Sequence, residues 1–169
     1  MSRICCIRYK EVNMNQEKLY AVMQDDLFNR DSAALLYRIA EHWTLVTTKY
    51  HAYVMPADMV DGDLVGNKWS EDSHVHHRID NTLNGSDLVC IGHMTVNVNM
   101  LRQKVLVMRD DFGIVYFIRW TKTAEMLSKD KKIRCKRYQD LVCWWSADDD
   151  FPIYAACEIN PQQARGIAK

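Results

Sequence analysis

Two short segments pair a histidine with a threonine two residues later, and these residue types could do chemistry at that spacing. His42 precedes Thr44 and His93 precedes Thr95, and residues that favour strands follow each pair. In a strand, residues i and i+2 point to the same face, so each histidine would share a face with its threonine. If the two strands lie side by side, two imidazoles and two hydroxyls converge on one site.

Such a site could cleave a phosphodiester without a metal ion or any other cofactor. One neutral imidazole would take a proton from water or a ribose hydroxyl, and the other, as imidazolium, would protonate the leaving oxygen. Histidine suits both steps because its unperturbed pKa is about 6.5. The hydroxyls of Thr44 and Thr95 would donate hydrogen bonds to the phosphate oxygens as negative charge develops. The predicted catalytic residues are therefore His42, His93, Thr44 and Thr95.

The segments 42–45 (HWTL) and 93–96 (HMTV) resemble the paired motifs of the two-histidine phosphoesterase superfamily. That superfamily includes RNA cyclic phosphodiesterases, 2′,5′-phosphodiesterases and viral enzymes that destroy cyclic-nucleotide or oligoadenylate signals. The resemblance implies a two-lobed α+β fold with both motifs on central strands of a cleft. It also implies that the two histidines are the acid and base and that the two threonines bind phosphate. It is limited to these two segments, which are closer in sequence than the family usually places them.

Four further side chains are expected to contact the substrate. His76 and Arg78 lie in a long polar segment that could act as a lid over a phosphate, and arginine pairs well with phosphate. Trp43, inside the first motif, and Tyr116 complete the set. The expected ligand is a small anionic nucleotide or oligonucleotide, cyclic or 2′,5′-linked, such as an immune or signalling messenger.

A second group of histidines, at 73–77 (SHVHH), leaves a different chemistry open. Its first two histidines have the His-hydrophobe-His form of rolling-circle replication and relaxase nucleases, and the segment also resembles the start of an HNH nuclease. On a strand, His74 and His76 would face one way and could hold a divalent metal. A downstream tyrosine, Tyr116 or Tyr138, would then attack DNA. The alternative is an exposed polar loop with solvated histidines.

A basic run with few acidic residues is the third candidate feature, and it adjoins Trp120 and Tyr138. A basic patch with aromatic side chains can hold single-stranded nucleic acid or an oligonucleotide. The alternative is a solvated face that is balanced by acidic residues elsewhere. The run consists of Arg119, Lys122, Lys129, Lys131, Lys132, Arg134, Lys136 and Arg137.

The overall composition limits the class of partner. The 22 basic side chains equal the 22 acidic ones, whereas duplex-binding proteins usually carry a basic excess, so duplex DNA is disfavoured. No apolar run approaches the roughly 20 residues that span a bilayer, and no signal peptide is recognisable, so we expect a cytoplasmic protein without membrane association. The six cysteines form no CxxC pair, which favours buried, reduced thiols.

These residues must be positioned by helices and strands, and the order of the expected elements indicates an α+β protein. We expect a mostly antiparallel sheet, two early helices and a two-lobed cleft. The early helices are expected within 13–28 and 31–43, and a short one within 121–132. The sequence DDFG at 110–113 predicts a hairpin turn. Strands are expected within 3–9, 44–55, 86–101, 104–109, 114–120, 133–145 and 151–159.

The length predicts a single domain over 1–169, with a long irregular loop at about 56–86 and a frayed tail at about 160–169. The function predicted first is a metal-independent phosphodiesterase. One alternative is a non-enzymatic viral or phage accessory protein that binds a ligand or a host protein. The other is a metal-dependent, histidine-rich nuclease. Under either alternative, His42 ends a helix and the two threonines are ordinary strand residues.

Overall fold

The computed structural model describes residues 14–28, 35–60, 74–147 and 151–160. This part of the chain holds three α-helices and nine strands, which confirms the predicted α+β class with a mostly antiparallel sheet. The helices are α2 (Met14–Phe28), α3 (His74–Asn81) and α4 (Lys122–Lys129), with two short 3₁₀ helices, η1 (Ala57–Met59) and η2 (Thr82–Asn84). The strands are β1 (Leu35–Ala40), β2 (Trp43–Thr47), β3 (His51–Pro56), β4 (Ser86–Val98), β5 (Leu101–Arg109), β6 (Val115–Arg119), β7 (Arg134–Tyr138), β8 (Leu141–Trp145) and β9 (Pro152–Cys157).

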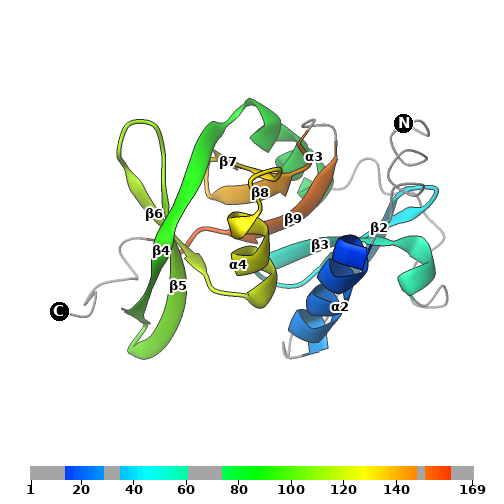
Figure 1. Ribbon diagram of the computed structural model, residues 1–169, viewed down its shortest axis with the longest axis horizontal. Helices are drawn as coiled ribbons and strands as arrows, with labels where there is room; N and C mark the ends of the chain where they lie inside the picture. Colours follow the sequence, from blue (N-terminus) through cyan, green and yellow to red (C-terminus); the bar gives the residue numbers. More distant parts are fainter. Residues whose placement is uncertain (1–13, 29–34, 61–73, 148–150, 161–169) are drawn as a thin grey trace.

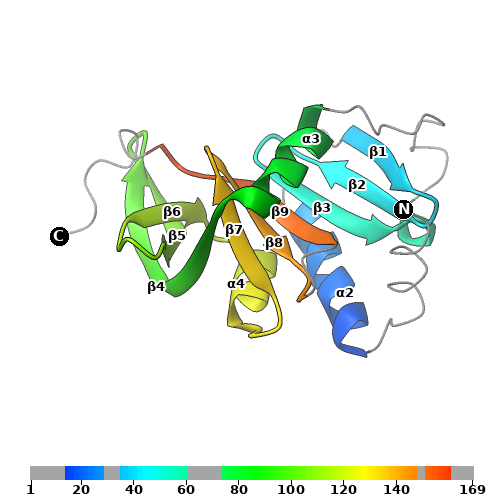
Figure 2. The ribbon, with the colours of Figure 1, turned by 90° about the horizontal axis from the view of Figure 1, so that it is seen from above.

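The nine strands form one antiparallel sheet in the order β1-β2-β3-β9-β8-β7-β4-β5-β6. Strands β1 to β3 lie toward one end of the long axis of the molecule and β4 to β6 toward the other (Figures 1 and 2). After β9 the chain also reaches β6, where Ile118 and Glu158 form an antiparallel bridge. The six neighbouring strands from β9 to β6 are therefore also joined at their two ends, because the last of them, β6, pairs with the chain just after β9.

Helices cover both faces of the sheet. Figure 2 shows α2 and α4 on one side and α3 on the other. Two neighbouring residues of β8 connect the layers, because adjacent strand residues point to opposite faces. The Trp144 indole N–H donates to Ser128 Oγ of α4 at 3.1 Å, and the Trp145 indole N–H donates to Thr82 Oγ1 of η2 at 2.8 Å.

The core lies between these layers and is rich in aromatic side chains. Trp43, Tyr53, Trp144, Trp145 and Tyr154 are all fully buried. Burial of each such side chain contributes on the order of 2 kcal/mol of transfer free energy. The predicted helix α2 is confirmed, and its residues at helical spacing supply part of the core, as do the apolar residues of the predicted helix α4.

The prediction of a second early helix is wrong for residues 35–40, which form β1. The apolar run there is too short for its periodicity to separate a helix from a strand, and pairing with β2 decides the outcome. The single strand expected over 44–55 is a hairpin of β2 and β3 instead. All described strands belong to one sheet, so the strand order does not divide them into two separate lobes.

The long irregular loop expected at 56–86 is partly wrong. Its described residues form η1, α3 and η2, and β4 begins at Ser86. The predicted hairpin of β5 and β6 is confirmed, with Gly113 at φ 84° in its turn. Strands β4 and β9 also fall within the predicted ranges, whereas the single strand expected over 133–145 is a hairpin of β7 and β8. The strand expected at 3–9 and the tail after 160 lie outside the described residues. No helix within the described ranges is long and apolar enough to cross a membrane.

Candidate functional site

The structure separates the two histidines that were expected to form an acid–base pair. His42 lies in the turn between β1 and β2, and His93 lies within β4. Four strands stand between β2 and β4, so five steps of about 4.8 Å place the two residues on the order of 20 Å apart. Figures 1 and 2 show that turn and β4 toward opposite ends of the molecule. The reason is the strand order, because β2 pairs with β1 and β3 while β4 pairs with β5 and β7.

The two threonines are no better placed to meet at one phosphate. The side chain of Thr44 is 0% exposed, and its hydroxyl has no hydrogen-bond partner among the described residues. Thr95 is half-buried on β4, on the same distant strand as His93. The convergence of two imidazoles and two hydroxyls is therefore not a property of this fold.

The histidines at 74–77 lie on the helix α3 and not on a strand. Residues i and i+2 on a helix point about 200° apart, so His74 and His76 cannot grip one metal ion as they would on a strand. His76 instead approaches Asp80, one turn later, at 3.4 Å. The described ranges contain no group of three or more His, Cys, Asp or Glu residues that could hold a metal ion.

The remaining predicted contact residues lie on different elements. Arg78 on α3 donates to Asp140 Oδ1 at 2.7 Å, and Tyr116 on β6 donates to Asp110 Oδ2 at 2.9 Å. Burial raises the pKa of the Tyr116 hydroxyl, and the hydrogen bond to Asp110 raises it further. A tyrosine held protonated in this way does not suit the role of a nucleophile toward DNA. Of the predicted site residues, only Trp43 lines the groove described next.

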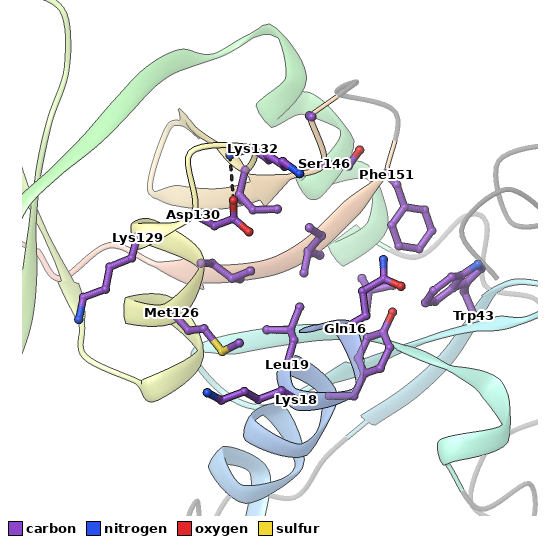
Figure 3. A pocket seen from close by; sticks show the side chains of 16 residues that line it. Gln16, Lys18, Leu19, Trp43, Met126, Lys129, Asp130, Lys132, Ser146 and Phe151 are labelled. Carbon is purple, nitrogen blue, oxygen red and sulfur yellow. Dashed lines mark hydrogen bonds between the residues drawn. The ribbon is translucent and has the colours of Figure 1, made fainter. Parts of the chain in front are cut away.

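A groove of about 810 Å³ lies between α2, α4 and the strands beneath them, and we call it the α2–α4 groove (Figure 3). The aliphatic side chains of Met126, Ile133 and Ile153 are half-buried there, so each keeps some accessible apolar surface. The groove is lined by Gln16, Lys18, Leu19, Tyr20, Trp43, Val54, Met126, Leu127, Lys129, Asp130, Lys132, Ile133, Ser146, Ala147, Phe151 and Ile153.

Aromatic rings close one end of this groove. Trp43 packs against Phe151 with ring centroids 4.5 Å apart and against Tyr20 with centroids 6.5 Å apart. All three side chains are buried. They therefore act as a fixed wall, and the accessible apolar surface is left to the aliphatic residues.

Lysines dominate the charge around the groove. Lys18 comes from α2, and Lys129 and Lys132 come from the end of α4 and the turn that follows. Asp130 is the one acidic residue among the described residues that line the groove, and it accepts the backbone N–H of Lys132 at 2.9 Å. In Figure 3 the Lys132 side chain extends across the groove toward Ser146. Among the described residues that line the groove there are three lysines and one carboxylate, and Lys129 also lies 3.8 Å from Glu125 on the same helix. This excess of cations favours an anionic ligand with an apolar part.

The basic run in the sequence pointed to this site only in part. It contains Lys129 and Lys132 but not Lys18, which the packing of α2 against α4 brings to the same groove. Several members of the run have partners: Lys129 lies 3.8 Å from Glu125, Arg134 contacts Asp87 at 3.2 Å, and Lys136 donates to the Leu83 carbonyl at 3.2 Å. Of the basic run, Lys129 and Lys132 line the groove, and together with Lys18 they give it a local excess of lysines.

The four cysteines in the described ranges are free; Cys135 and Cys143 are buried, as predicted, whereas Cys90 and Cys157 are half-buried. Burial raises the pKa of the Cys135 thiol and of the Cys143 thiol well above the ordinary value, so both stay protonated and unreactive at neutral pH. They are core residues and contribute nothing to the groove.

Comparisons of the chain with protein-family models, with curated proteins and with solved structures gave no match.

Proposed function

We propose that the protein is a non-enzymatic binder that holds a small anionic nucleotide or short oligonucleotide in the α2–α4 groove. The observation that carries this proposal is the composition of the groove, an aliphatic floor bordered by Lys18, Lys129 and Lys132. A phosphate would contact the ammonium groups, and the less polar sugar and base would cover Met126 and Ile153. Lysine is a common phosphate ligand that acts as a point charge.

Two further properties support this ligand class. The groove volume of about 810 Å³ falls in the usual range of roughly 300–1,000 Å³ for small-molecule sites. The chain has equal numbers of basic and acidic residues, so attraction of an anion depends on a local excess of cations such as this one. A duplex would require a more extended basic surface.

The proposal keeps the ligand predicted from the sequence and gives up the two-histidine chemistry. No histidine is among the described residues that line the groove, and His42 and His93 lie several strands apart. General acid–base catalysis needs a proton donor and an acceptor within reach of one phosphate. A ligand in this groove would therefore be sequestered and not cleaved.

The test is a binding assay combined with a turnover assay. The purified protein would be titrated by calorimetry with 2′,3′-cyclic nucleotides, cyclic di- and trinucleotides and 2′,5′-oligoadenylate, and the same mixtures would be followed by chromatography for cleavage. We expect saturable binding of at least one compound without turnover. Lys132→Glu and Lys18→Glu should each weaken that binding by roughly tenfold, because each replaces an attractive contact by a repulsive one.

Lys122→Glu is the matched control, because Lys122 is exposed on the same helix α4 but does not line the groove. It makes the same change in net charge and should alter affinity by less than about twofold. Equal losses in all three variants would contradict a specific groove. Turnover that survives a chelator and disappears in His42→Ala and His93→Ala would restore the phosphodiesterase prediction.

A second candidate function, binding of a host protein, rests on the turn between β5 and β6. Phe112 in this turn is 86% exposed, and Ile114 and Val115 beside it are also exposed. The Asp110 carboxylate accepts the backbone N–H groups of Phe112 and Ile114, both at 2.9 Å, and so fixes the turn. A rigid exposed aromatic side chain is typical of the anchor residues of protein interfaces.

This second candidate predicts a discrete photocrosslink when a benzoyl-phenylalanine replaces Phe112 in cell extract. Unlabelled wild-type protein should compete for the adduct, and the Phe112→Ser variant should not. The control position is Met100, which is 97% exposed in the turn between β4 and β5. The same adduct from position 100 would argue against a specific interface at Phe112.

A further inference from the structure

A second cleft, of about 330 Å³, lies where separate turns meet the end of β9, and we call it the β9-end cleft. The turn between β2 and β3, the turn between β4 and β5, the end of β6 and the turn between β7 and β8 all contribute to it. It shares no lining residue with the α2–α4 groove. The lining residues are Lys49, Tyr50, Asn99, Arg119, Asp140, Cys157, Glu158 and Ile159.

Backbone hydrogen bonds hold these segments together. The Cys157 N–H donates to the Tyr50 carbonyl at 3.0 Å, and the Glu158 N–H donates to the Asp140 carbonyl at 2.7 Å. The Ile159 N–H donates to a carbonyl of β6 at 2.9 Å. Three successive residues, beginning with the last residue of β9, thus bond to three different parts of the chain. A cleft built in this way is preorganised, so little ordering would accompany binding.

Both acidic residues of the cleft are already neutralised by arginines that do not line it. Asp140 accepts from Arg78 at 2.7 Å. Glu158 accepts from Arg137 at 2.9 Å, and its side chain is largely buried. Ion pairs with hydrogen-bond geometry such as these leave little free negative charge to balance another cation.

Two cations of the cleft have no such counter-ion. Arg119 Nη1 donates to the neutral Gln103 side chain at 2.6 Å, and the guanidinium lies 4.4 Å from the centroid of the Tyr50 ring. Lys49 Nζ lies 5.2 Å from the same ring. Neither cation forms an ion pair with any residue of the described ranges. The half-buried guanidinium is held in place on one side and keeps N–H groups for another acceptor.

The thiol in the cleft does not add a negative charge. Burial raises the pKa of the Cys157 thiol, although the nearby Arg78 and Arg119 act in the opposite direction. The thiol is therefore protonated at neutral pH. With two paired carboxylates and one neutral thiol, the two unpaired cations determine the sign of the field in the cleft.

We propose that the β9-end cleft is an anion site that binds a phosphate group, either free phosphate or the phosphate of a small monoester. The fork of Arg119 would bind two phosphate oxygens, and Lys49 would add a point charge. The cleft volume is at the lower limit for small-molecule sites, which leaves room for only a small group beyond the phosphate. This inference is independent of the function proposed for the α2–α4 groove.

The test is a titration of the full chain with inorganic phosphate, followed by calorimetry and by backbone amide shifts in NMR spectra. Phenyl phosphate is the monoester probe and acetate the carboxylate probe. We expect saturable shifts at Tyr50, Arg119 and Cys157 with both phosphates, and none that saturate with acetate. Arg119→Met should raise the Kd for phosphate roughly tenfold, equivalent to about 1.4 kcal/mol, and Arg119→Lys should recover only part of the loss.

Lys49→Met is a second variant, at an exposed position, and it should weaken phosphate binding a few-fold. Arg109→Met is the matched control, because Arg109 is an exposed arginine on β5 that does not line the cleft. Lys132→Glu, which affects the other groove, should leave phosphate binding unchanged. Phosphate binding that is absent at millimolar concentrations, equal to that of acetate, or unchanged in both Arg119→Met and Lys49→Met would overturn the proposal.

Discussion

The carboxylate of Asp110 organises the turn between β5 and β6. It accepts two backbone N–H groups of that turn at 2.9 Å and the Tyr116 hydroxyl at 2.9 Å. Burial alone would raise the pKa of this carboxyl, but the hydrogen bonds from Ile114, Tyr116 and Phe112, with the charge of Arg137, lower it below its ordinary value. The folded state therefore favours the ionised form of Asp110 over the protonated form.

This lowered pKa predicts a pH-dependent effect of Asp110→Asn. A carboxyl with a lower pKa in the folded state contributes stability above its unfolded-state pKa of about 3.9 and loses it as the pH falls through the folded-state value. At pH 7 the variant should therefore unfold at a lower temperature than the wild type, and the difference should shrink in acid. Thermal unfolding followed by circular dichroism at several pH values measures this. Asp111→Asn, at the exposed neighbouring position, should have little effect, and a constant difference at all pH values would contradict the assignment.

Gly85 predicts a second effect at the scale of single residues. A Cβ atom at this position would overlap the Arg137 carbonyl oxygen and lie 2.6 Å from its carbon. Because backbone atoms cannot move aside easily, Gly85→Ala should cost about 1–3 kcal/mol in the free energy of unfolding, measured by chemical denaturation. Ser86→Ala at the adjacent exposed position should stay within about 0.5 kcal/mol of the wild type. Equal stability of the two variants would show that β4 and β7 do not approach so closely.

At the scale of elements, α4 links the core to the α2–α4 groove. Its N-cap, Thr121, accepts the Ala124 N–H at 3.0 Å and lies 3.1 Å from the Tyr154 hydroxyl. That hydroxyl lies 2.7 Å from His51 Nδ1, so a chain of buried polar groups runs from β3 through β9 to the start of the helix. The other end of α4 carries Lys129, at the border of the groove. The orientation of α4 therefore sets the position of Lys129 and of Lys132, which lies in the turn that follows the helix.

Loss of the cap should consequently reduce both stability and ligand binding. Thr121→Ala removes the capping hydroxyl and should cost about 1–2 kcal/mol of unfolding free energy. Thr121→Ser keeps the hydroxyl and should cost less than half as much. Denaturation curves measure both variants, and titration with the ligand of the groove shows whether affinity follows. The assignment of Thr121 as a stabilising cap fails if the alanine and serine variants are equally stable.

Local patterns predicted the elements whose signals are strong on their own. The helices α2 and α4 have apolar residues at helical spacing, and the β5–β6 hairpin has a turn with glycine where φ is positive. Strand β1 was predicted as a helix because its short apolar run fits both periods, and only its partner β2 makes it a strand. Helix α3 was not predicted, because its segment is polar and only one of its residues, Ile79, is buried, so it has no sustained apolar periodicity.

The site was harder to predict than the elements, because it depends on which elements become neighbours. The histidine pair required β2 and β4 to be adjacent, and nothing in either segment specifies the four strands between them. The basic run identified Lys132 but could not identify Lys18, which joins it only through the contact of two helices. The acids that neutralise the rest of the run, such as Asp87 and Glu158, are also distant in sequence.

At the scale of the whole molecule, β9 is the strand on which the sheet depends. It lies between β3 and β8, and the residues that follow it reach β6. The strands β1 to β3 come early in the chain, whereas β7 to β9 come late. The sheet is therefore complete only when β9, near the end of the described chain, pairs with the early strand β3 as well as with β8, which directly precedes it.

This position predicts the order of hydrogen exchange. The amides of Ala155 and Ala156 in β9 are buried and have hydrogen-bonded strands on both sides, so they should exchange among the slowest, through global unfolding. Amides of β1, at the edge of the described sheet, should exchange faster through local opening. Exchange followed by NMR spectroscopy measures both. Slower exchange in β1 than in β9 would contradict this order of stability.

The neighbouring indoles of Trp144 and Trp145 have a practical consequence. One indole is hydrogen-bonded to α4 and the other to η2, so two adjacent residues sense opposite layers of the protein. Their fluorescence can report on each layer separately when the other four of the five tryptophans are replaced by phenylalanine. A ligand that enters beside α4 would change the emission that Trp144 supplies and leave that of Trp145 nearly constant. The chain thus carries its own pair of optical probes, one for each side of the sheet.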